Sequence, residues 1–383
     1  MSIRSSIEQQ TADNSWMVSA LTLVYNAMAL AHPNPRVGAI VVKDGQKVGE
    51  GVHVYDRRDH AEVVALKQAG EKARGATLYV TLEPCCTTGR TGPCTKAIIA
   101  AGVTRVVAAM KDPNPRVAGR GFAELKRAGI EVRVGTDENS AKQLNEDFAK
   151  WIRTGLPFVT LKTALTLDGQ IAMRPGCATS ITGEAARGAV QRLRHAADAL
   201  LTGIGTVLAD DPLLTDRSGG PRRLRLLRVV LDSRLHSPLK SKLVKSARGD
   251  LLVFAGQNAD LRKSRALERA GAEVVRVRAR RGRLDLHAVL RELGKRGILH
   301  VVLEAGAELN GAALKADLVD KIALFYAPKV MGTGGVPMAE IPSTWFPKSP
   351  ALENLTVNRY GPDFVVEGYF HDVYGNHRTR RKN

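Results

Sequence analysis

Two short stretches of this sequence constrain its fold most strongly. Together they contain a histidine, a glutamate and two cysteines. The first stretch is His60-Ala61-Glu62; the second begins at Glu83-Pro84-Cys85 and reaches Cys94, with eight residues between its two cysteines. Two thiolates and one imidazole give zinc three protein ligands and leave its fourth position for water, which is typical of a catalytic site. We therefore expect His60, Cys85 and Cys94 to bind Zn²⁺, which requires the fold to bring a helix start and a strand end together.

Glu62 indicates the chemistry of this site. It lies two positions after His60, where it can take a proton from water and pass it to a leaving amine. Zinc in such a site makes a water molecule acidic near neutral pH. The H-x-E … P-C arrangement is typical of zinc-dependent nucleobase deaminases, whose glutamate does not bind the metal. Cys86, adjacent to Cys85, cannot easily face the same ion, and we predict no metal role for it.

Strands alternating with helices predict an α/β fold in two domains, residues 11–155 and 156–370. The dipeptide Asp44-Gly45 predicts a hairpin, and a helix that ends at Gly155 marks the boundary. In the first domain we expect helices at residues 16–31, 60–70, 94–101 and 122–127, and strands at 37–42, 78–82, 105–109 and 130–134.

A second α/β series begins at Phe158. We expect helices at residues 184–194 and 261–270, and strands at 158–164, 199–202, 227–231, 251–254, 274–277, 299–303 and 321–326. Residues 371–383 are basic with little that is apolar, which predicts a disordered, solvated tail.

The charge of the chain bears on its partners. Lys and Arg exceed Asp and Glu by 19, and residues 217–296 carry 22 basic against seven acidic residues. Such charge favours a nucleic acid, an anionic membrane or a phosphorylated small molecule. Aromatic residues make up only 5% of the chain, whereas proteins that bind single strands use stacking as well as charge. We therefore expect a phosphorylated ligand and no nucleic acid, and interpret most of the basic stretch as a solvated surface.

The ends and the cysteines indicate the compartment. No apolar run approaches the ~20 residues of a membrane-spanning helix, and the polar first ten residues do not resemble a secretory signal. Three of the four cysteines lie within ten residues, which is typical of a metal site in a reducing compartment. We expect a cytoplasmic protein without a membrane partner.

Five motifs in the first domain together resemble one family. They are H-P-N-P-R-V-G at 32–38, H-A-E at 60–62, T-L-E-P-C at 81–85, G-R-T-G-P-C at 89–94 and D-P-N-P-R-V-A-G-R-G at 112–121. The bifunctional riboflavin-biosynthesis enzymes, which join a pyrimidine deaminase to a reductase, are similar in all five. The resemblance implies an α/β protein with an N-terminal cytidine-deaminase-like three-layer domain and a C-terminal dihydrofolate-reductase-like domain.

The resemblance also implies roles in the first domain. His60, Cys85 and Cys94 would bind zinc and Glu62 would move the proton. The pyrimidine pocket would be lined by Asn34, His53 and Asn114, and Arg90 would offer a guanidinium to the substrate phosphate.

Each of these binding residues has a plainer interpretation. The two asparagines, each between prolines, fit turns; the histidine fits an ordinary strand position, and the arginine a solvated loop. Where the family commonly has serine and histidine after the first zinc cysteine, this chain has Cys86, Thr87 and Thr88. That departure concerns the loop and its substrate contacts and leaves the metal ligands unchanged.

The second domain has no G-x-G-x-x-G between a first strand and a helix, so a Rossmann fold is a weak interpretation. Its motifs are L-K-T-A at 161–164, L-D-G at 167–169, I-T-G at 181–183, G-I-G-T-V-L-A-D-D-P at 203–212 and L-E-A-G-A at 303–307. The last leads from a strand through glycine to a helix, whose free N–H groups suit phosphate. Together they resemble the reductase half of the same family over residues 158–369.

This resemblance implies two ligand sites. NADPH would lie near Ala164, Thr206, Asp210, Ser233 and Gly306. The ribosyl phosphate end of the substrate would lie near Arg194, Leu214, Arg217 and Glu304. Arg194 could instead be a helix-end cation that meets the helix dipole. Where the family commonly has a serine and a tryptophan, this chain has Ala178 and Ser180.

The expected function is two consecutive steps of riboflavin synthesis. The first is zinc-dependent deamination of 2,5-diamino-6-ribosylamino-4(3H)-pyrimidinone 5′-phosphate, and the second is NADPH-dependent reduction of its ribosyl group to ribityl. We expect a phosphorylated pyrimidine nucleotide as substrate and a homo-oligomer. Two alternatives stay open: only one half is active, or the chain is a nucleic-acid base deaminase with a basic binding domain.

Overall fold

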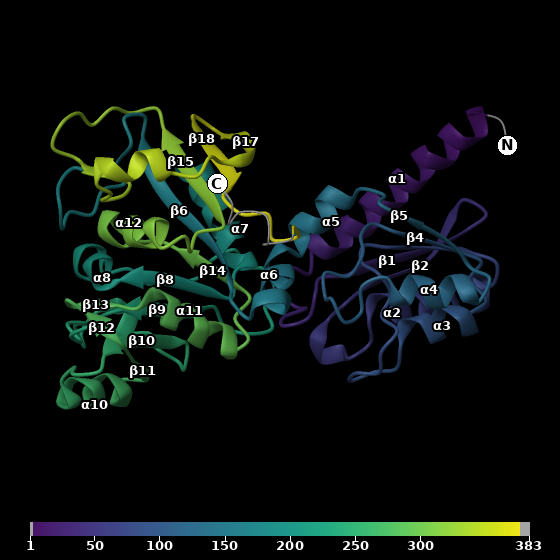
Figure 1. Cartoon of the computed structure of the whole chain (residues 1–383), viewed down its shortest axis with the longest axis horizontal. Coiled ribbons are helices and arrows are strands. Elements are labelled where there is room, and N and C mark those ends of the chain that lie inside the picture. Colours follow the sequence, from purple (N-terminus) through teal and green to yellow (C-terminus); the bar gives the residue numbers. More distant parts are fainter. Residues whose placement is uncertain (1–2, 376–383) are drawn as a thin grey trace. The chain divides into compact units, whose positions relative to one another are not determined.

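The chain forms two compact units (Figure 1) in a computed structural model that describes residues 3–375. The first unit holds the residues up to Thr154 together with Pro221–Arg223, and the second holds the rest. A three-residue piece from the middle of the chain therefore belongs with its beginning.

The first unit is a five-stranded sheet in the order β2-β1-β3-β4-β5. Its β1 pairs antiparallel with β2 and β3, whereas β3, β4 and β5 are parallel. The strands are β1 (Gly38–Lys43), β2 (Gln46–Val52), β3 (Thr77–Val80), β4 (Arg105–Ala108) and β5 (Glu131–Val134). The helices are α1 (Ile3–Tyr25), α2 (Ala61–Ala69), α3 (Cys94–Ala100), α4 (Arg120–Arg127), α5 (Glu138–Leu144) and α6 (Glu146–Thr154).

Two glycines allow helices to lie directly on this sheet. A Cβ on Gly51 of β2 would lie 2.3 Å from the carbonyl oxygen of Ala61 in α2, and a Cβ on Gly38 of β1 would lie 2.2 Å from that of Ala20 in α1. No larger residue fits at either position. Gly51 pairs with Ala39, the neighbour of Gly38, so the two glycines face opposite sides of the sheet. The result is a three-layer unit that holds the first turn of α2 against β2.

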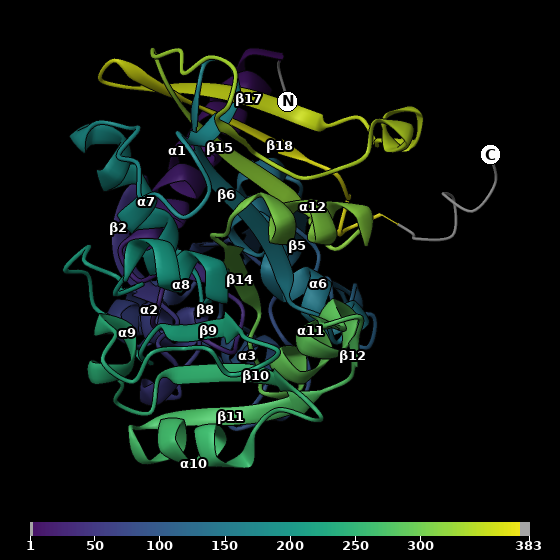
Figure 2. The same ribbon diagram turned by 90° about the vertical axis from the view of Figure 1, so that its left-hand side faces the viewer.

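The second unit is built on a nine-stranded sheet in the order β11-β10-β9-β8-β14-β6-β15-β18-β17. Figure 2 shows these strands following one another across the unit. Its strands are β6 (Phe158–Thr166), β8 (Ala199–Gly203), β9 (Leu227–Leu231), β10 (Leu251–Gly256), β11 (Ala272–Val277), β14 (His300–Leu303), β15 (Lys321–Ala327), β17 (Glu353–Tyr360) and β18 (Asp363–Tyr369). Two small sheets pair β7 (Gln170–Ala172) with β16 (Val336–Pro337), and β12 (Ala279–Arg280) with β13 (Arg283–Leu284).

Helices cover both faces of the large sheet. They are α7 (Glu184–Ala196), α8 (Ile204–Asp210), α9 (Lys242–Lys245), α10 (Leu261–Arg269), α11 (Leu286–Lys295) and α12 (Ala307–Lys315). One core cluster includes Leu290 of α11 and Ala313 of α12, and a second includes Val207, Leu243 and Leu267 of α8, α9 and α10. The strands from β11 to β15 are parallel, and β18 and β17 add an antiparallel edge. The predicted mixed α/β class is confirmed.

The first helix begins and ends earlier than the sequence predicts, at Ile3 and Tyr25 instead of residues 16 and 31. Its early part lacks an apolar stripe, and a carboxylate anchors it instead. Asp13 is fully buried and accepts two hydrogen bonds of 2.8 Å from the guanidinium of Arg105. Burial opposes its charge, but the hydrogen bonds of Arg105 and others outweigh burial and lower the pKa of Asp13.

The predicted disordered tail is wrong for residues 371–375. His371 Nδ1 lies 3.1 Å from a carboxylate oxygen of Asp320, and the side chain of Val373 is buried. The remaining residues of that predicted tail, 376–383, lie outside the described part of the chain. None of the helices in residues 3–375 has the length and apolar character needed to cross a membrane.

Candidate active sites

The three predicted zinc ligands meet at one place in the first unit. His60 precedes α2, Cys94 is the first residue of α3, and Cys85 lies in the loop between β3 and α3. His60 Nδ1 lies 3.1 Å from Cys94 Sγ and 3.4 Å from Cys85 Sγ, and all three ligand atoms lie within 4.8 Å of one another. Zinc takes nitrogen at ~2.0 Å and thiolate at ~2.3 Å, so these atoms can surround one ion. Cys86 is not part of the cluster.

The electrostatics of the cluster suit a metal and a proton carrier. A hydrogen bond with Cys94 lowers the pKa of Cys85 to about 4, and His60 adds to this effect. The thiolate is the metal-binding form of cysteine. Glu62 is 3% exposed in the first turn of α2; burial raises its pKa to about 7, and Cys85 adds to the shift. A cation in the cluster would oppose this shift.

Two of the predicted pocket residues are bonded to each other beside the cluster. Asn34 Nδ2 lies 3.0 Å from His53 Nε2, and His53 Nδ1 lies 3.0 Å from the carbonyl oxygen of Asp59. A carbonyl can only accept, so Nδ1 carries the proton and Nε2 accepts from the asparagine amide. Burial lowers the pKa of His53, and its ring meets that of His60 edge-on at 5.2 Å between centroids. His53 is therefore a neutral, oriented imidazole.

Asn114 takes part in a turn, as its plainer interpretation held. Its side-chain oxygen accepts the backbone N–H of Arg116 at 3.1 Å, and its own N–H donates to Asp112 Oδ1 at 2.7 Å. Burial raises the pKa of Asp112 to about 6, and the nearby charges of Glu83 and Cys85 add to the shift. The turn thus lies near the cysteine cluster, with the Asn114 oxygen already engaged.

Glu83 organises the loop that holds this turn, a role the sequence did not predict. Its carboxylate is 3% exposed and accepts four backbone N–H groups. They belong to Asp112, Gly119, Gly121 and Phe122, at 3.1, 2.8, 2.9 and 3.4 Å. The available signal was an acidic residue at the end of an apolar strand, in the motif T-L-E-P-C.

Arg90 shares an aromatic ring with a second arginine. Its guanidinium carbon lies 4.0 Å from the ring centroid of Tyr55, and that of Arg223 lies 4.1 Å from the same centroid. Arg223 also donates to the carbonyl oxygen of His32 at 3.2 Å and to Asp56 Oδ1 at 2.8 Å. Arg90 Nη1 donates to the Tyr55 carbonyl at 3.2 Å. The loop arginine is therefore held in place, although its side chain is exposed.

The second unit contains a cavity of about 670 Å³. Six predicted ligand-binding residues line it: Ala164, Thr206, Asp210, Ser233, Glu304 and Gly306. They come from β6, α8, the end of β9 and the turn between β14 and α12. Four separate chain segments, which the sequence could assign to a ligand site only by resemblance, thus line one cavity.

The Gly306 turn suits a phosphate. Gly306 immediately precedes α12, and no side chain caps that helix start. Among the described residues 3–375, no atom lies within 4 Å of where a Cβ on Gly306 would be, so the turn leaves room for a ligand close to its backbone. N–H groups at a helix start bind anions, and NADPH would bring its pyrophosphate to such a site.

Glu304 is one of the acidic residues that line this cavity, and two cations hold it. Arg194 binds it with Nε to Oε1 at 2.8 Å and Nη2 to Oε2 at 2.9 Å, and Lys162 Nζ lies 3.5 Å from Oε2. Burial opposes its charge, but the two cations outweigh burial and lower the pKa of Glu304 to about 2. Lys162, which also lines the cavity, was not predicted; a lysine within an apolar strand was its signal.

The three other predicted substrate residues are not among the cavity-lining residues. Arg194 joins Glu304 to the loop after α8, because its Nη1 donates to the carbonyl oxygen of Thr215 at 3.0 Å. Leu214 is 5% exposed, and its side chain packs in a core cluster. Arg217 is exposed, and its backbone N–H donates to Gln191 at 2.8 Å. Of the two departures from the family pattern, Ala178 and Ser180 are both exposed.

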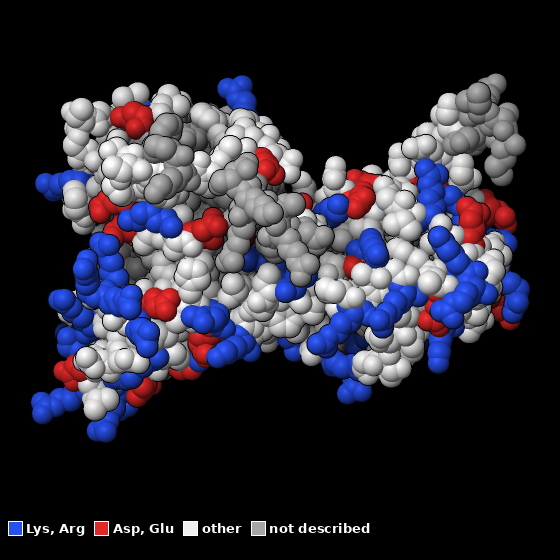
Figure 3. All heavy atoms as spheres, in the orientation of Figure 1, with Lys and Arg blue, Asp and Glu red and all other residues white. Residues whose placement is uncertain are grey.

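Basic residues gather on the surface of the second unit around the β12–β13 hairpin. Figure 3 shows blue side chains over this region. Arg283 lines the cavity with Ser233, and Arg234 Nη2 lies 3.6 Å from the Cβ position of Gly282 in the hairpin turn. The basic stretch therefore reaches one end of the cavity.

Comparisons with known proteins cover both units. The family described as "Cytidine and deoxycytidylate deaminase zinc-binding region" matches residues 10–110, and "RibD C-terminal domain" matches residues 157–366. The riboflavin biosynthesis protein RibD of Escherichia coli is 42% identical over 369 residues, covering 92% of this chain and 98% of that protein.

Solved structures of similar proteins agree with these sequence comparisons. RibD of Acinetobacter baumannii has a TM-score of 0.84 and 38% identity, over 95% of this chain and all of that one. A diaminohydroxyphosphoribosylaminopyrimidine deaminase/5-amino-6-(5-phosphoribosylamino)uracil reductase of Thermotoga maritima has a TM-score of 0.81 and 33% identity, over 95% and 100%.

Proposed function

The chain belongs to the family of bifunctional riboflavin biosynthesis proteins named RibD, and from this premise we propose which residues perform each of its two reactions. It is a zinc-dependent deaminase fused to an NADPH-dependent reductase, and it acts on a phosphorylated pyrimidine. The observation that carries the assignment is that both sets of motif residues converge. The His60, Cys85 and Cys94 ligands meet in one unit, and six further residues line one cavity in the other.

In the first reaction, water replaces the amino group on a ring carbon of the diaminopyrimidine nucleotide and ammonia leaves. Zinc held by the three ligands would activate that water and polarise the ring. Glu62 takes a proton from the water and delivers it to the departing nitrogen. Its burial at the start of α2, beside the ligands, supports this role. The bonded pair Asn34 and His53 orients the ring through hydrogen bonds.

Asn114 and Arg90 complete this proposed site. The Asn114 oxygen already accepts from Arg116, so its amide N–H₂ is the group left to donate to the pyrimidine. Arg90 is exposed and fixed over Tyr55, which suits a guanidinium that receives the 5′-phosphate from solution.

In the second reaction, the sugar C1′ of the deaminated product accepts a hydride and the ribosyl group opens to ribityl. NADPH supplies the hydride; the chain binds and orients the two molecules. We place the cofactor along Ala164, Thr206, Asp210, Ser233 and Gly306. We place the ribosyl phosphate beside Glu304 and the loop of residues 213–217, which Arg194 attaches to that carboxylate.

The arginines at the Ser233 end would select NADPH over NADH. With the pyrophosphate at Gly306, the adenosine end of the cofactor reaches toward Ser233. Arg283 and Arg234 lie there, and a guanidinium binds a phosphate through two parallel hydrogen bonds. The 2′-phosphate that distinguishes NADPH supplies such a group.

This proposal accounts for the basic charge without a nucleic acid. We further propose that the protein is cytoplasmic, because free metal-binding cysteines need a reducing compartment, and that it forms a homo-oligomer. A titration with labelled RNA at rising salt would give weak binding; tight, steeply salt-dependent binding would favour the base-deaminase alternative.

Turnover of the diamino nucleotide tests both halves at once. With NADPH, mass spectrometry should find the deaminated ribityl product; without it, the reaction should stop at the deaminated ribosyl compound. Absence of ammonia release or of NADPH oxidation would mean that the corresponding half is inactive. The departures from the family pattern at Thr87, Thr88, Ala178 and Ser180 are the reason to test each half.

A further inference from the structure

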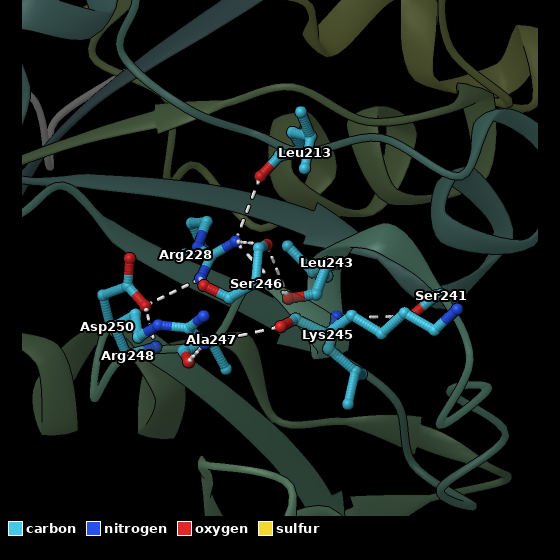
Figure 4. Close-up of polar contacts among 10 residues, drawn as sticks. Leu213, Arg228, Ser241, Leu243, Lys245, Ser246, Ala247, Arg248 and Asp250 are labelled. Carbon is cyan, nitrogen blue, oxygen red and sulfur yellow. Dashed lines mark hydrogen bonds and ion pairs between the residues drawn. The ribbon is translucent and has the colours of Figure 1, made fainter.

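Arg228 of β9 is a charged side chain inside the second unit that neither reaction uses. It is 1% exposed, although arginine is rarely buried without partners. Figure 4 shows its guanidinium between the carbonyl of Leu213 on one side and Asp250 on the other. Nη2 donates to Asp250 Oδ1 at 2.7 Å and to the carbonyl oxygen of Ser246 at 3.1 Å.

The contact with Leu213 reaches the proposed substrate loop. Arg228 Nη1 donates to the Leu213 carbonyl oxygen at 3.3 Å, to that of Leu243 at 3.4 Å and to Ser246 Oγ at 2.7 Å. The next residue, Leu214, has a φ of +52°, in the left-handed region that a branched side chain rarely adopts. Such a conformation persists only where the surroundings enforce it.

Two guanidiniums hold the carbonyls on either side of this strained residue. Arg228 holds the carbonyl before Leu214, and Arg194 holds the carbonyl of Thr215 after it, at 3.0 Å. The Leu214 side chain is anchored in the core between them. The backbone that leads to Arg217 is therefore held by hydrogen bonds on both sides of Leu214.

We propose that Arg228 is a positioning residue of the reductase, which fixes the Leu213 carbonyl so that residues 214–217 present the substrate's ribosyl phosphate site. This inference rests on the proposed place of the substrate at that loop. It assigns to Arg228 no contact with substrate or cofactor.

A purely structural role is the rival explanation. Arg228 also holds two carbonyls at the end of α9, those of Leu243 and Ser246, and its ion pair with Asp250 joins β9 to the start of β10. Either role makes the residue matter for folding. Only a positioning role predicts that loss of the Leu213 contact weakens substrate binding without weakening cofactor binding.

The test compares Arg228→Lys with Asp250→Asn in the full-length protein. Lysine keeps the charge but has one compact ammonium group, which cannot reach Asp250 and Leu213 together. Asparagine keeps an accepting oxygen but removes the negative charge opposite the same guanidinium, and it leaves the Leu213 contact in place. Steady-state reduction is measured with the deaminated ribosyl nucleotide and with NADPH varied separately.

For Arg228→Lys we expect the KM for the nucleotide to rise about tenfold, the size expected for a lost hydrogen bond from a charged group. The KM for NADPH and the rate of ammonia release should stay within about twofold of wild type. Asp250→Asn should lower the unfolding temperature but leave the nucleotide KM within about twofold. An unchanged nucleotide KM in folded Arg228→Lys, or an equal rise in Asp250→Asn, would overturn the proposal.

Two further variants keep the test decisive. If Arg228→Lys does not fold, Arg228→Gln is measured against the same criteria. Arg217→Ala tests the proposed substrate site itself. If the nucleotide KM rises in Arg217→Ala but not in the Arg228 variant, the positioning role of Arg228 is refuted and the substrate site stands. No change in either variant refutes the placement of the substrate at this loop.

Discussion

Replacing Glu83 by glutamine should selectively weaken the deaminase unit. The glutamine oxygen can still accept from two of the four N–H groups that the carboxylate holds between 2.8 and 3.4 Å. Its N–H₂ group would face the other two donors. Two lost charge-assisted hydrogen bonds, at about 1.5–3 kcal/mol each, give a destabilisation of about 3–6 kcal/mol.

This loss of unfolding free energy corresponds to a lower unfolding temperature. For a unit of this size each kcal/mol lowers the unfolding temperature by about 2–4 °C, so Glu83→Gln should lower it by about 10 °C. Heating the full-length protein in steps and assaying each activity after cooling would show ammonia release lost first, with NADPH oxidation retained. Because the loop carries Asn114, the KM for the diamino nucleotide should also rise.

Glu131→Gln is the matched control, since it removes one carboxylate from the same unit at a side chain that is 67% exposed. Exposed ion pairs contribute about 0–1 kcal/mol, so this variant should inactivate close to the wild-type temperature. Equal thermal profiles for Glu83→Gln and Glu131→Gln would refute the reasoning, because the buried carboxylate would then contribute no more than an exposed one.

Four further predictions concern the two chemistries. Glu62→Gln should abolish ammonia release while metal analysis still finds one zinc per chain; retained turnover would disprove its proton role. Dialysis against a zinc chelator should remove deamination and spare reduction, with zinc restoring the loss. Arg283→Ala should raise the KM for NADPH about tenfold and leave that for NADH unchanged; a parallel rise would place the 2′-phosphate elsewhere. Glu304 has a native pKa of about 2 against an ordinary 4.5, so its contribution, about 3 kcal/mol, is complete above pH 4.5 and declines as pH falls toward 2. The difference in unfolding free energy between wild type and Glu304→Gln should shrink over that window, and a constant difference would contradict the shift.

The metal cluster could be predicted from the sequence because its chemistry dictates both residue type and position. A catalytic zinc site needs thiolates and an imidazole, and His60 and Cys94 each stand at a helix start that the apolar periodicity already marked. The core strands were predictable for a similar reason. β10 is a continuous apolar run, buried between parallel neighbours in the sheet.

What could not be predicted depends on partners distant in the chain. β17 has no buried side chain among Glu353–Arg359, so no core position identifies it as a strand, and its pairing with β18 is what defines it. Glu83 and Arg228 read as ordinary charges until the fold supplies their partners. In the same way Asp13, 92 positions before Arg105, fixes the early part of α1.

The placement of Pro221–Arg223 in the first unit has a consequence for how these two enzymes can be made. A gene cut after Thr154 would yield a deaminase fragment without Arg223, which stacks on Tyr55 and donates to the His32 carbonyl. Two polypeptides expressed from such a cut do not correspond to the two structural units, because residues Pro221–Arg223 of the first unit would be in the second polypeptide. The deaminase unit is thus complete only in the undivided chain. The two activities should therefore be separated by point variants in the intact protein.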